Sequence, residues 1–148
     1  MKYLFLLLYS IQVLTGNQTF SFPEDSHHFY YFLEKKLSHK DQNITIFTAE
    51  LQLPTLKNVL IKSQHNHFQI FVQRISPMIQ DIALYRHIEI FLCSEIRQNL
   101  IIFEKNQLIS TLKFKESLLR QTTGEVKEVF KRSDVPIIYP HKQDCKSY

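Results

Sequence analysis

The stretch Ser94–Lys115, "SEIRQNLIIFEKNQLISTLKFK", holds two apolar runs separated by four polar residues. The first run, "NLIIFE" (99–104), is continuously apolar, whereas the second, "LISTLKF" (108–114), alternates between two sets of side chains. Alternation with a period of two indicates a strand, and a short polar break between two such runs indicates a hairpin. This stretch therefore predicts a β-hairpin whose turn lies at Glu104–Gln107.

The same rhythm extends toward the N-terminus. β-Branched and aromatic residues dominate, and polar breaks fall about every 8–12 residues, which is typical of an all-β sandwich. We therefore predict a single antiparallel β-sandwich of the jelly-roll or lectin-like type, with a possible C-terminal helix over 116–132 that is broken at Gly124. The further strands lie within 43–53, which Pro54 ends, and within 58–63, 67–75 and 82–93.

An all-α, cytokine-like bundle is the alternative fold. The segments "FYYFLEKKL" (29–37) and "ESLLRQTTGEVKEVFKR" (116–132) can form helices, and the chain has only two glycines, which hairpin turns usually need. However, the region 57–115 lacks clean polar faces at helical spacing and contains a single alanine. These features favour the β-sandwich.

The N-terminus predicts secretion. Residues 1–16, "MKYLFLLLYSIQVLTG", combine one lysine, an apolar run and a small-residue exit, which is typical of a signal peptide. A membrane span needs about 20 apolar residues, and polar side chains interrupt this run earlier. We expect a signal peptide at 1–16, a single secreted domain at 17–148, an extracellular location and no membrane span.

Two cysteines and two sequons fit that compartment. Cys93 and Cys145 are expected to form a disulfide, because paired thiols in an oxidising compartment usually bond. The alternative is a buried free thiol at Cys93 and a loose tail carrying Cys145. "NIT" at Asn43 and "NQT" at Asn17 are N-glycosylation sequons, of which Asn43 is the better candidate because the polar segment before it suggests an exposed loop.

The charge pattern argues against nucleic-acid binding. The net charge of +4 is modest, and its lysines and arginines are scattered along the sequence. A run of basic residues that could follow a phosphate backbone does not occur. The expected partner is instead an extracellular glycan or protein, and nucleic acid is not expected.

Histidines supply the few candidates for chemistry. His65 and His67 in "QHNHF" would lie on one face of an extended segment, where two imidazoles can share zinc or copper. This pair offers a small metal-dependent hydrolase as a third, less favoured function. A polar turn between strands is the preferred interpretation, so no metal site is predicted.

His27 and His28 follow Asp25 and Ser26 in "PEDSHHFYYF". Catalytic triads assemble around a strained nucleophile turn with an oxyanion hole, and the chain has no G-x-S-x-G to build one. We interpret this segment as an exposed entry to the first strand or helix. Cofactor fingerprints such as the P-loop are also absent from the sequence. We therefore predict no catalytic residue, no cofactor and no enzyme activity.

Several segments resemble the farnesoic acid O-methyltransferase-like domain of insect proteins. The likeness is carried by "HHFYYFL", "ITIFTAELQLPTLKNVLIKS", "FQIFVQ" and "LIIFEKNQLISTLKF", and it covers about residues 28–114. Where that family has Gly-Gly-Trp, this chain has Gln73, Arg74 and Ile75, and it contains no tryptophan. The resemblance implies a β-sandwich binding module rather than a methyltransferase.

Together these features predict a secreted, non-catalytic recognition module that binds a glycan or an extracellular protein. The alternative is a secreted, helical cytokine-like ligand or immune-modulating effector.

Overall fold

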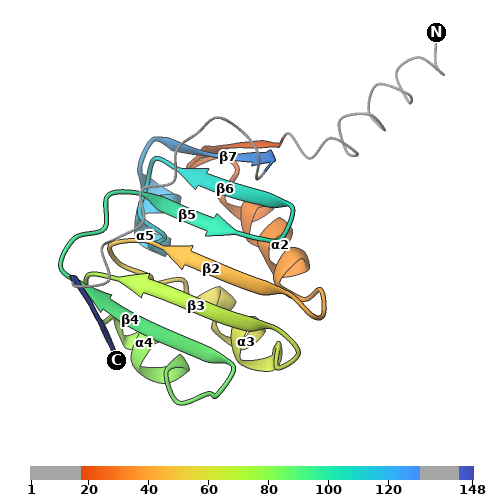
Figure 1. Cartoon of the computed structure of the whole chain (residues 1–148). Coiled ribbons are helices and arrows are strands. Elements are labelled where there is room, and N and C mark those ends of the chain that lie inside the picture. The colour runs from red at the N-terminus through yellow and green to blue at the C-terminus, as the bar shows by residue number, and fades with distance from the viewer. Residues whose placement is uncertain (1–17, 131–143) are drawn as a thin grey trace, which may run out of the picture.

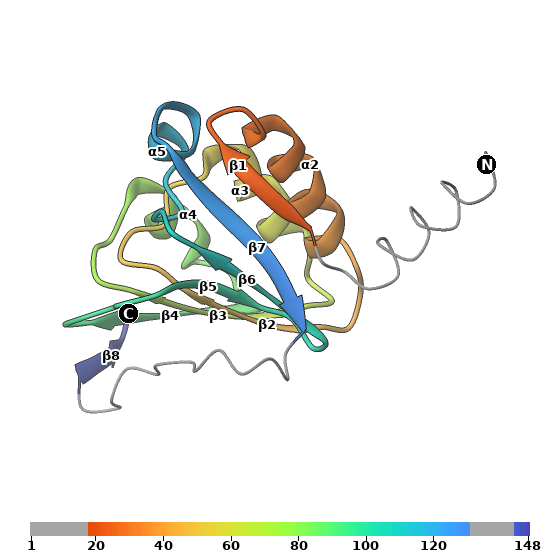
Figure 2. The same cartoon turned by 90° about the horizontal axis from the view of Figure 1, so that it is seen from above.

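The computed structural model describes residues 18–130 and 144–148. These form one eight-stranded mixed sheet with four helices on one of its faces (Figures 1 and 2). Both the predicted all-β sandwich and the alternative all-α bundle are wrong. In chain order the elements are β1 (Thr19–Phe22), α2 (Ser26–Leu37), β2 (Asn43–Phe47), α3 (Pro54–Lys62), β3 (His67–Val72), α4 (Pro77–Ile82), β4 (Ile88–Cys93), β5 (Asn99–Ile102), β6 (Asn106–Ser110), α5 (Glu116–Gln121), β7 (Gly124–Phe130) and β8 (Cys145–Ser147).

The strand order is β1-β7-β6-β5-β2-β3-β4-β8. Strands β2, β3 and β4 are parallel neighbours, and every other pairing is antiparallel. Parallel neighbours need a crossover connection, which α3 and α4 supply here. We call the edge at which β2, β3 and β4 end the carboxyl edge, and the opposite edge the amino edge.

The apolar run 58–63, predicted as a strand, lies in helix α3. Pro54 occupies its first turn, where its fixed φ suits a helix and its missing N–H costs nothing. Leu56 and Leu60, four residues apart, are buried on the same face of this helix. The predicted strand 43–53 is correspondingly shorter and ends at Phe47.

The predicted hairpin is confirmed, but its turn is shorter than the predicted Glu104–Gln107, because β6 begins at Asn106. Strands β5 and β6 pair antiparallel, from Asn99 opposite Ser110 to Ile102 opposite Gln107. The predicted helix over 116–132 is correct only for α5, because strand β7 begins at Gly124. A Cβ atom on Gly124 would lie 2.5 Å from the Leu112 side chain, so glycine permits this close approach of the two segments.

Helix α2 was expected in the helical alternative, and its start was otherwise left open as the first strand or helix. Its buried residues Phe29, Tyr30, Leu33 and Leu37 follow the spacing of a helix face and pack on the sheet. On the other sheet face, Phe71 of β3 stacks on two neighbours, with ring centroids 4.8 Å from Phe47 and 4.7 Å from Phe91. The main core therefore lies between the sheet and its single helical layer.

All four helices begin at the carboxyl edge. Helices α3 and α4 follow the parallel strands β2 and β3, while the antiparallel ladder through β5 and β6 to β7 also makes β1 and β6 end there. Helices α2 and α5 follow these two strands. Among residues 18–130 and 144–148, no helix is long and apolar enough to cross a membrane.

Candidate active site at the carboxyl edge

Two groups of polar side chains lie at the carboxyl edge, and the first is structural. Thr48, directly after β2, is fully buried, and its hydroxyl lies 2.9 Å from Oδ1 of Asn99 at the start of β5. The same hydroxyl accepts the N–H of Phe114 at 3.2 Å. These buried groups satisfy one another and include no ionisable side chain, so the contacts fix the loops after β2 and β6.

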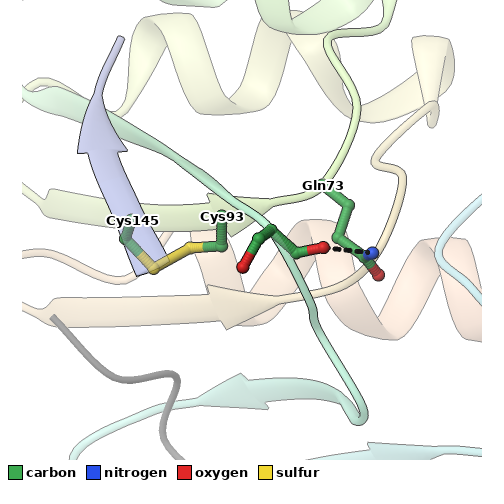
Figure 3. The surroundings of a disulfide bond; sticks show 4 residues. Gln73, Cys93 and Cys145 are labelled. Carbon is green, nitrogen blue, oxygen red and sulfur yellow. Dashed lines mark hydrogen bonds between the residues drawn. A yellow bond between two sulfur atoms is a disulfide. The ribbon is translucent and has the colours of Figure 1, made fainter. Parts of the chain in front are cut away.

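The loop after β4 is fastened in a similar way (Figure 3). A disulfide joins Cys93 at the end of β4 to Cys145 of β8, and the Gln73 amide donates to the Ser94 carbonyl at 3.1 Å. The disulfide thus anchors β8, the last described strand, to its neighbour β4. Neither contact leaves a reactive group facing solvent.

The second group surrounds a hollow of about 330 Å³ between α2 and α5, lined by Ser26, His27, Tyr30 and Arg120. We call this hollow the Tyr30 pocket. Tyr30 is only 7% exposed, and its hydroxyl has no hydrogen-bond partner among the described residues. A buried hydroxyl without a partner costs about 1–3 kcal/mol, so native proteins seldom retain one without a reason.

Charged groups beside Tyr30 form a short network. Arg120 Nη2 lies 2.5 Å from Oε1 of Glu116, which also accepts the Thr55 hydroxyl at 2.8 Å. Burial, and next the carboxylate of Glu116, raise the pKa of Tyr30 to about 12. The Arg120 guanidinium opposes this shift through its charge and through its approach to the Tyr30 hydroxyl, although the two groups do not form a hydrogen bond of good geometry. Tyr30 therefore keeps its proton at neutral pH and can donate it in a hydrogen bond.

The start of α2 adds further donors to the Tyr30 pocket. The first N–H groups of a helix have no partner inside it, and no acceptor is found for those of His27 and His28 in the described part of the chain. Asp25 does not cap them, because its side chain accepts the N–H of Ser21 instead. The first turn of α2 also holds no acidic residue that would oppose an anion.

The donors of this pocket match an oxyanion. Backbone N–H groups at a helix N-terminus favour negative charge, and an arginine provides a planar fork of N–H donors for phosphate or carboxylate. Tyr30 supplies one neutral donor, and the imidazole of His27 is the kind of side chain that most often transfers protons in enzymes. The pocket can therefore hold a phosphoryl group beside an acid–base residue.

The remaining predicted residues lie elsewhere. His67 begins β3 at the amino edge, with Nε2 3.3 Å from Oε1 of Glu89, and His65 lies in the preceding turn. Across the described ranges, no three His, Cys, Asp or Glu side chains gather as a metal site would require. Asn43 is exposed at the start of β2, where its use as a glycan acceptor remains a prediction. Asn17 and the predicted signal peptide lie outside the described residues.

From the sequence, His27 was considered as a catalytic residue and not predicted as one, and Tyr30 and Arg120 were not recognised as site residues. Tyr30 belongs to "FYYF", which looks like core packing, and Arg120 stands alone in a polar segment. One available signal was the absence of an acidic residue in the first turn of a helix that begins "SHHFYYF". That signal becomes visible only when the segment is known to be helical.

No protein-family model matches the chain, and no curated protein matches its sequence. Solved structures do share its fold. A phospholipase D family member, Nuc from Salmonella typhimurium, superposes with a TM-score of 0.63 at 13% identity, over 77% of this chain and 82% of Nuc. NucT from Helicobacter pylori gives 0.62 at 12% identity, over 76% and 83%. A polyphosphate kinase from Porphyromonas gingivalis gives 0.58 at 11% identity, over 83% of this chain but 22% of the kinase.

These similarities overturn the predicted function together with the fold. The non-catalytic recognition module was inferred from a β-sandwich, and the cytokine-like ligand from a helical bundle, and neither fold is present. The β-sandwich implied by the farnesoic acid O-methyltransferase-like resemblance is absent as well. The prediction of no enzyme activity is contradicted because structures with this fold include a phospholipase D family member and a kinase. The fold is an α/β fold similar to that of the phospholipase D family.

Proposed function

We propose that the protein is an enzyme that cleaves phosphate esters, with the phosphoryl group bound in the Tyr30 pocket. The observation that carries the proposal is the Tyr30 hydroxyl, buried and unpartnered in a hollow that Arg120 and His27 also line. The location supports it, since open α/β sheets bind ligands beyond the carboxyl ends of their strands. The names of two structural neighbours, a phospholipase D family member and a polyphosphate kinase, also concern phosphate compounds.

Each side chain has a distinct role in the proposed reaction. Arg120, the first N–H groups of α2 and the Tyr30 hydroxyl hold the non-bridging oxygens of the phosphoryl group. His27 takes a proton from water as the water oxygen attacks phosphorus. The bond between phosphorus and the leaving oxygen then breaks, and His27 returns the proton to that oxygen. The products are an alcohol and a phosphate with one ester bond fewer.

The negative charge of Glu116 does not prevent anion binding. Glu116 is already engaged by Arg120 and by the Thr55 hydroxyl. A guanidinium group has five N–H donors, so Arg120 keeps donors for a ligand while it holds Glu116. Glu116 therefore positions Arg120 across the mouth of the pocket.

Hydrolysis of bis(4-nitrophenyl) phosphate and 4-nitrophenyl phosphate by the whole purified protein tests the proposal. His27→Ala should lower kcat at least about 100-fold, because general acid–base groups typically contribute that much. Arg120→Ala should raise KM by about tenfold, as the loss of one charged hydrogen bond predicts. His28→Ala is the matched control, since His28 is the adjacent, equally exposed histidine and does not line the pocket, and it should change kcat less than twofold.

Two results would contradict the proposed function. One is that the wild-type protein hydrolyses neither substrate. The other is that His27→Ala and His28→Ala have the same kcat, which would remove His27 from the reaction.

A further inference from the structure

A second hollow, of about 500 Å³, lies between α2 and α3. Glu34 lines it from α2, Ser38 from the residue that follows this helix, and Thr55 and Lys62 from the two ends of α3. His39 and Lys40, directly after α2, complete its far end. We call this hollow the α2–α3 groove, and it runs along both helices from the carboxyl edge toward the amino edge.

The far end of the α2–α3 groove is basic. An adjoining hollow of about 380 Å³ shares His39 and Lys40 and adds Lys36 and Lys105. Lys36 is committed to Glu128, with Nζ 2.8 Å from Oε2. In contrast, the salt bridges of the described residues include none with Lys40, Lys62 or Lys105. Across the two hollows lysines outnumber carboxylates two to one, the latter being Glu34 and Glu104.

The loop that carries His39 and Lys40 is held rigidly. The buried Asn66 donates to the carbonyls of Leu37 at 2.9 Å and His39 at 2.6 Å, and it accepts the N–H of Gln42 at 2.9 Å. The side-chain amide of Gln42 also donates to the His39 carbonyl, at 2.9 Å. These donors form hydrogen bonds with carbonyls at the end of α2 that would otherwise repel an anion. They also hold in place the backbone that carries the side chains of His39 and Lys40.

The other end of the groove adjoins the Tyr30 pocket. Thr55 lines the groove at the start of α3, and its hydroxyl donates to Glu116, the partner of Arg120. Lys62 lies seven residues after Thr55 on α3, so at 1.5 Å per residue the basic end lies about 10 Å further along. The contact of Thr55 with Glu116 therefore places a pocket with oxyanion donors next to a groove whose far end holds lysines without a salt bridge among the described residues.

We propose that the basic end of the α2–α3 groove binds a second phosphate of the ligand whose phosphoryl group lies in the Tyr30 pocket. The ligand is then an extended chain that carries phosphates more than about 10 Å apart. This inference rests on the proposed function, and it selects chain substrates over small esters. Lys40 and Lys62 neutralise the distal phosphate, and His39 and His65 offer hydrogen bonds beside them.

Binding of two phosphate chains tests the proposal. We would measure the anisotropy of a labelled single-stranded oligonucleotide of about twelve nucleotides, a length within the usual range of single-strand sites, at several salt concentrations. Long-chain inorganic polyphosphate serves as the competitor, and inorganic phosphate as the short probe. The test variant is Lys40→Gln/Lys62→Gln. The matched control is Lys127→Gln/Lys146→Gln, which removes the same charge from exposed positions on β7 and β8.

The test variant should weaken chain binding by roughly tenfold at low salt. It should also lower the salt slope by about 0.7, since the two lysines hold one phosphate and each neutralised phosphate of a single strand contributes about 0.7. The control should change neither value. Displacement of the oligonucleotide by polyphosphate at a lower phosphate concentration than by unlabelled oligonucleotide would identify an inorganic chain as the preferred ligand, and the reverse order a nucleic-acid strand. Displacement by inorganic phosphate at the same phosphate concentration as by either chain would contradict a second phosphate site. Equal binding by the wild-type protein, the test variant and the control would overturn the inference.

The failure of this inference can be told from failure of the proposed function. Hydrolysis of 4-nitrophenyl esters needs one phosphate and no groove, so Lys40→Gln/Lys62→Gln should hydrolyse them at the wild-type rate. If Lys40→Gln/Lys62→Gln has a smaller salt slope for chain binding but hydrolyses the esters normally, the groove and the pocket act independently. Loss of hydrolysis in His27→Ala with unchanged chain affinity separates them in the other direction.

Discussion

Tyr30→Phe should stabilise the protein and weaken its phosphate binding at the same time. The change removes one buried hydroxyl that has no partner in the described structure and keeps the ring, which packs 6.1 Å from the Phe29 ring. A buried hydroxyl without a hydrogen bond costs about 1–3 kcal/mol. Water entering the open hollow recovers part of that cost, so we expect a gain of about 1–2 kcal/mol.

Urea denaturation followed by far-UV circular dichroism measures this gain. The midpoint should rise while the m-value stays unchanged, because the surface exposed on unfolding is the same. Tyr31→Phe is the matched control: Tyr31 is 60% exposed on the same helix, and its change should stay within about 0.5 kcal/mol.

Repeating the denaturation in phosphate, with chloride at equal ionic strength as the reference, measures the predicted loss of phosphate binding. A ligand that binds only the folded state raises its stability, so phosphate should stabilise the wild-type protein and Tyr31→Phe more than Tyr30→Phe. Destabilisation of Tyr30→Phe by about 1 kcal/mol or more would refute the reasoning, because it would mean that the hydroxyl already makes a favourable hydrogen bond.

Three further predictions concern stability. Ionisation of Tyr30 should lower the stability of the fold further, because its pKa is about 12 in the folded protein and about 10 in the unfolded chain. The loss should begin above pH 10 and reach about 3 kcal/mol as pH rises through about 12, and alkaline urea denaturation should show it in the wild-type protein and not in Tyr30→Phe. Lys36→Met should destabilise the fold by roughly 3 kcal/mol, because it leaves the buried Glu128 carboxylate without its cation, and Lys36→Met/Glu128→Leu should recover most of that loss in thermal denaturation. Cys93→Ser/Cys145→Ser opens a link across 52 residues and should cost about 4 kcal/mol in the chain-entropy model, measured against the wild-type protein with and without reductant.

The hairpin was predictable from the sequence because all of its information is local. Two apolar runs with a polar break define β5 and β6, and Pro54 correctly marked a boundary. The short apolar run 58–63 after Pro54 was wrongly assigned to a strand. A buried strand and a buried helical turn have the same composition over six residues, and only the need to connect parallel strands β2 and β3 decides between them. That need is a property of the whole sheet.

The candidate site was less predictable than the fold. Lys40, Lys62 and Lys105 are isolated in the sequence, and the charge pattern therefore argued against a polyanion. The fold brings Lys40 and Lys62 together in the α2–α3 groove and places Lys105 in the adjoining hollow, next to a loop that Asn66 fixes. A charge cluster assembled from separate segments leaves no run for sequence reasoning to find.

Tyr30 also carries the argument that the carboxyl edge is a working site rather than ordinary core. A residue selected only for packing at this position would be phenylalanine, as its neighbour Phe29 is, because the hydroxyl adds a desolvation cost and makes no hydrogen bond in the described structure. The same spot holds the uncapped N–H groups of α2 and a guanidinium at the surface. The Tyr30 hydroxyl and the first N–H groups of α2 are thus hydrogen-bond donors without an acceptor in the described structure, and the Arg120 guanidinium keeps donors to spare. One bound oxyanion would satisfy them all, and sites that violate local rules in concert are where function is expected.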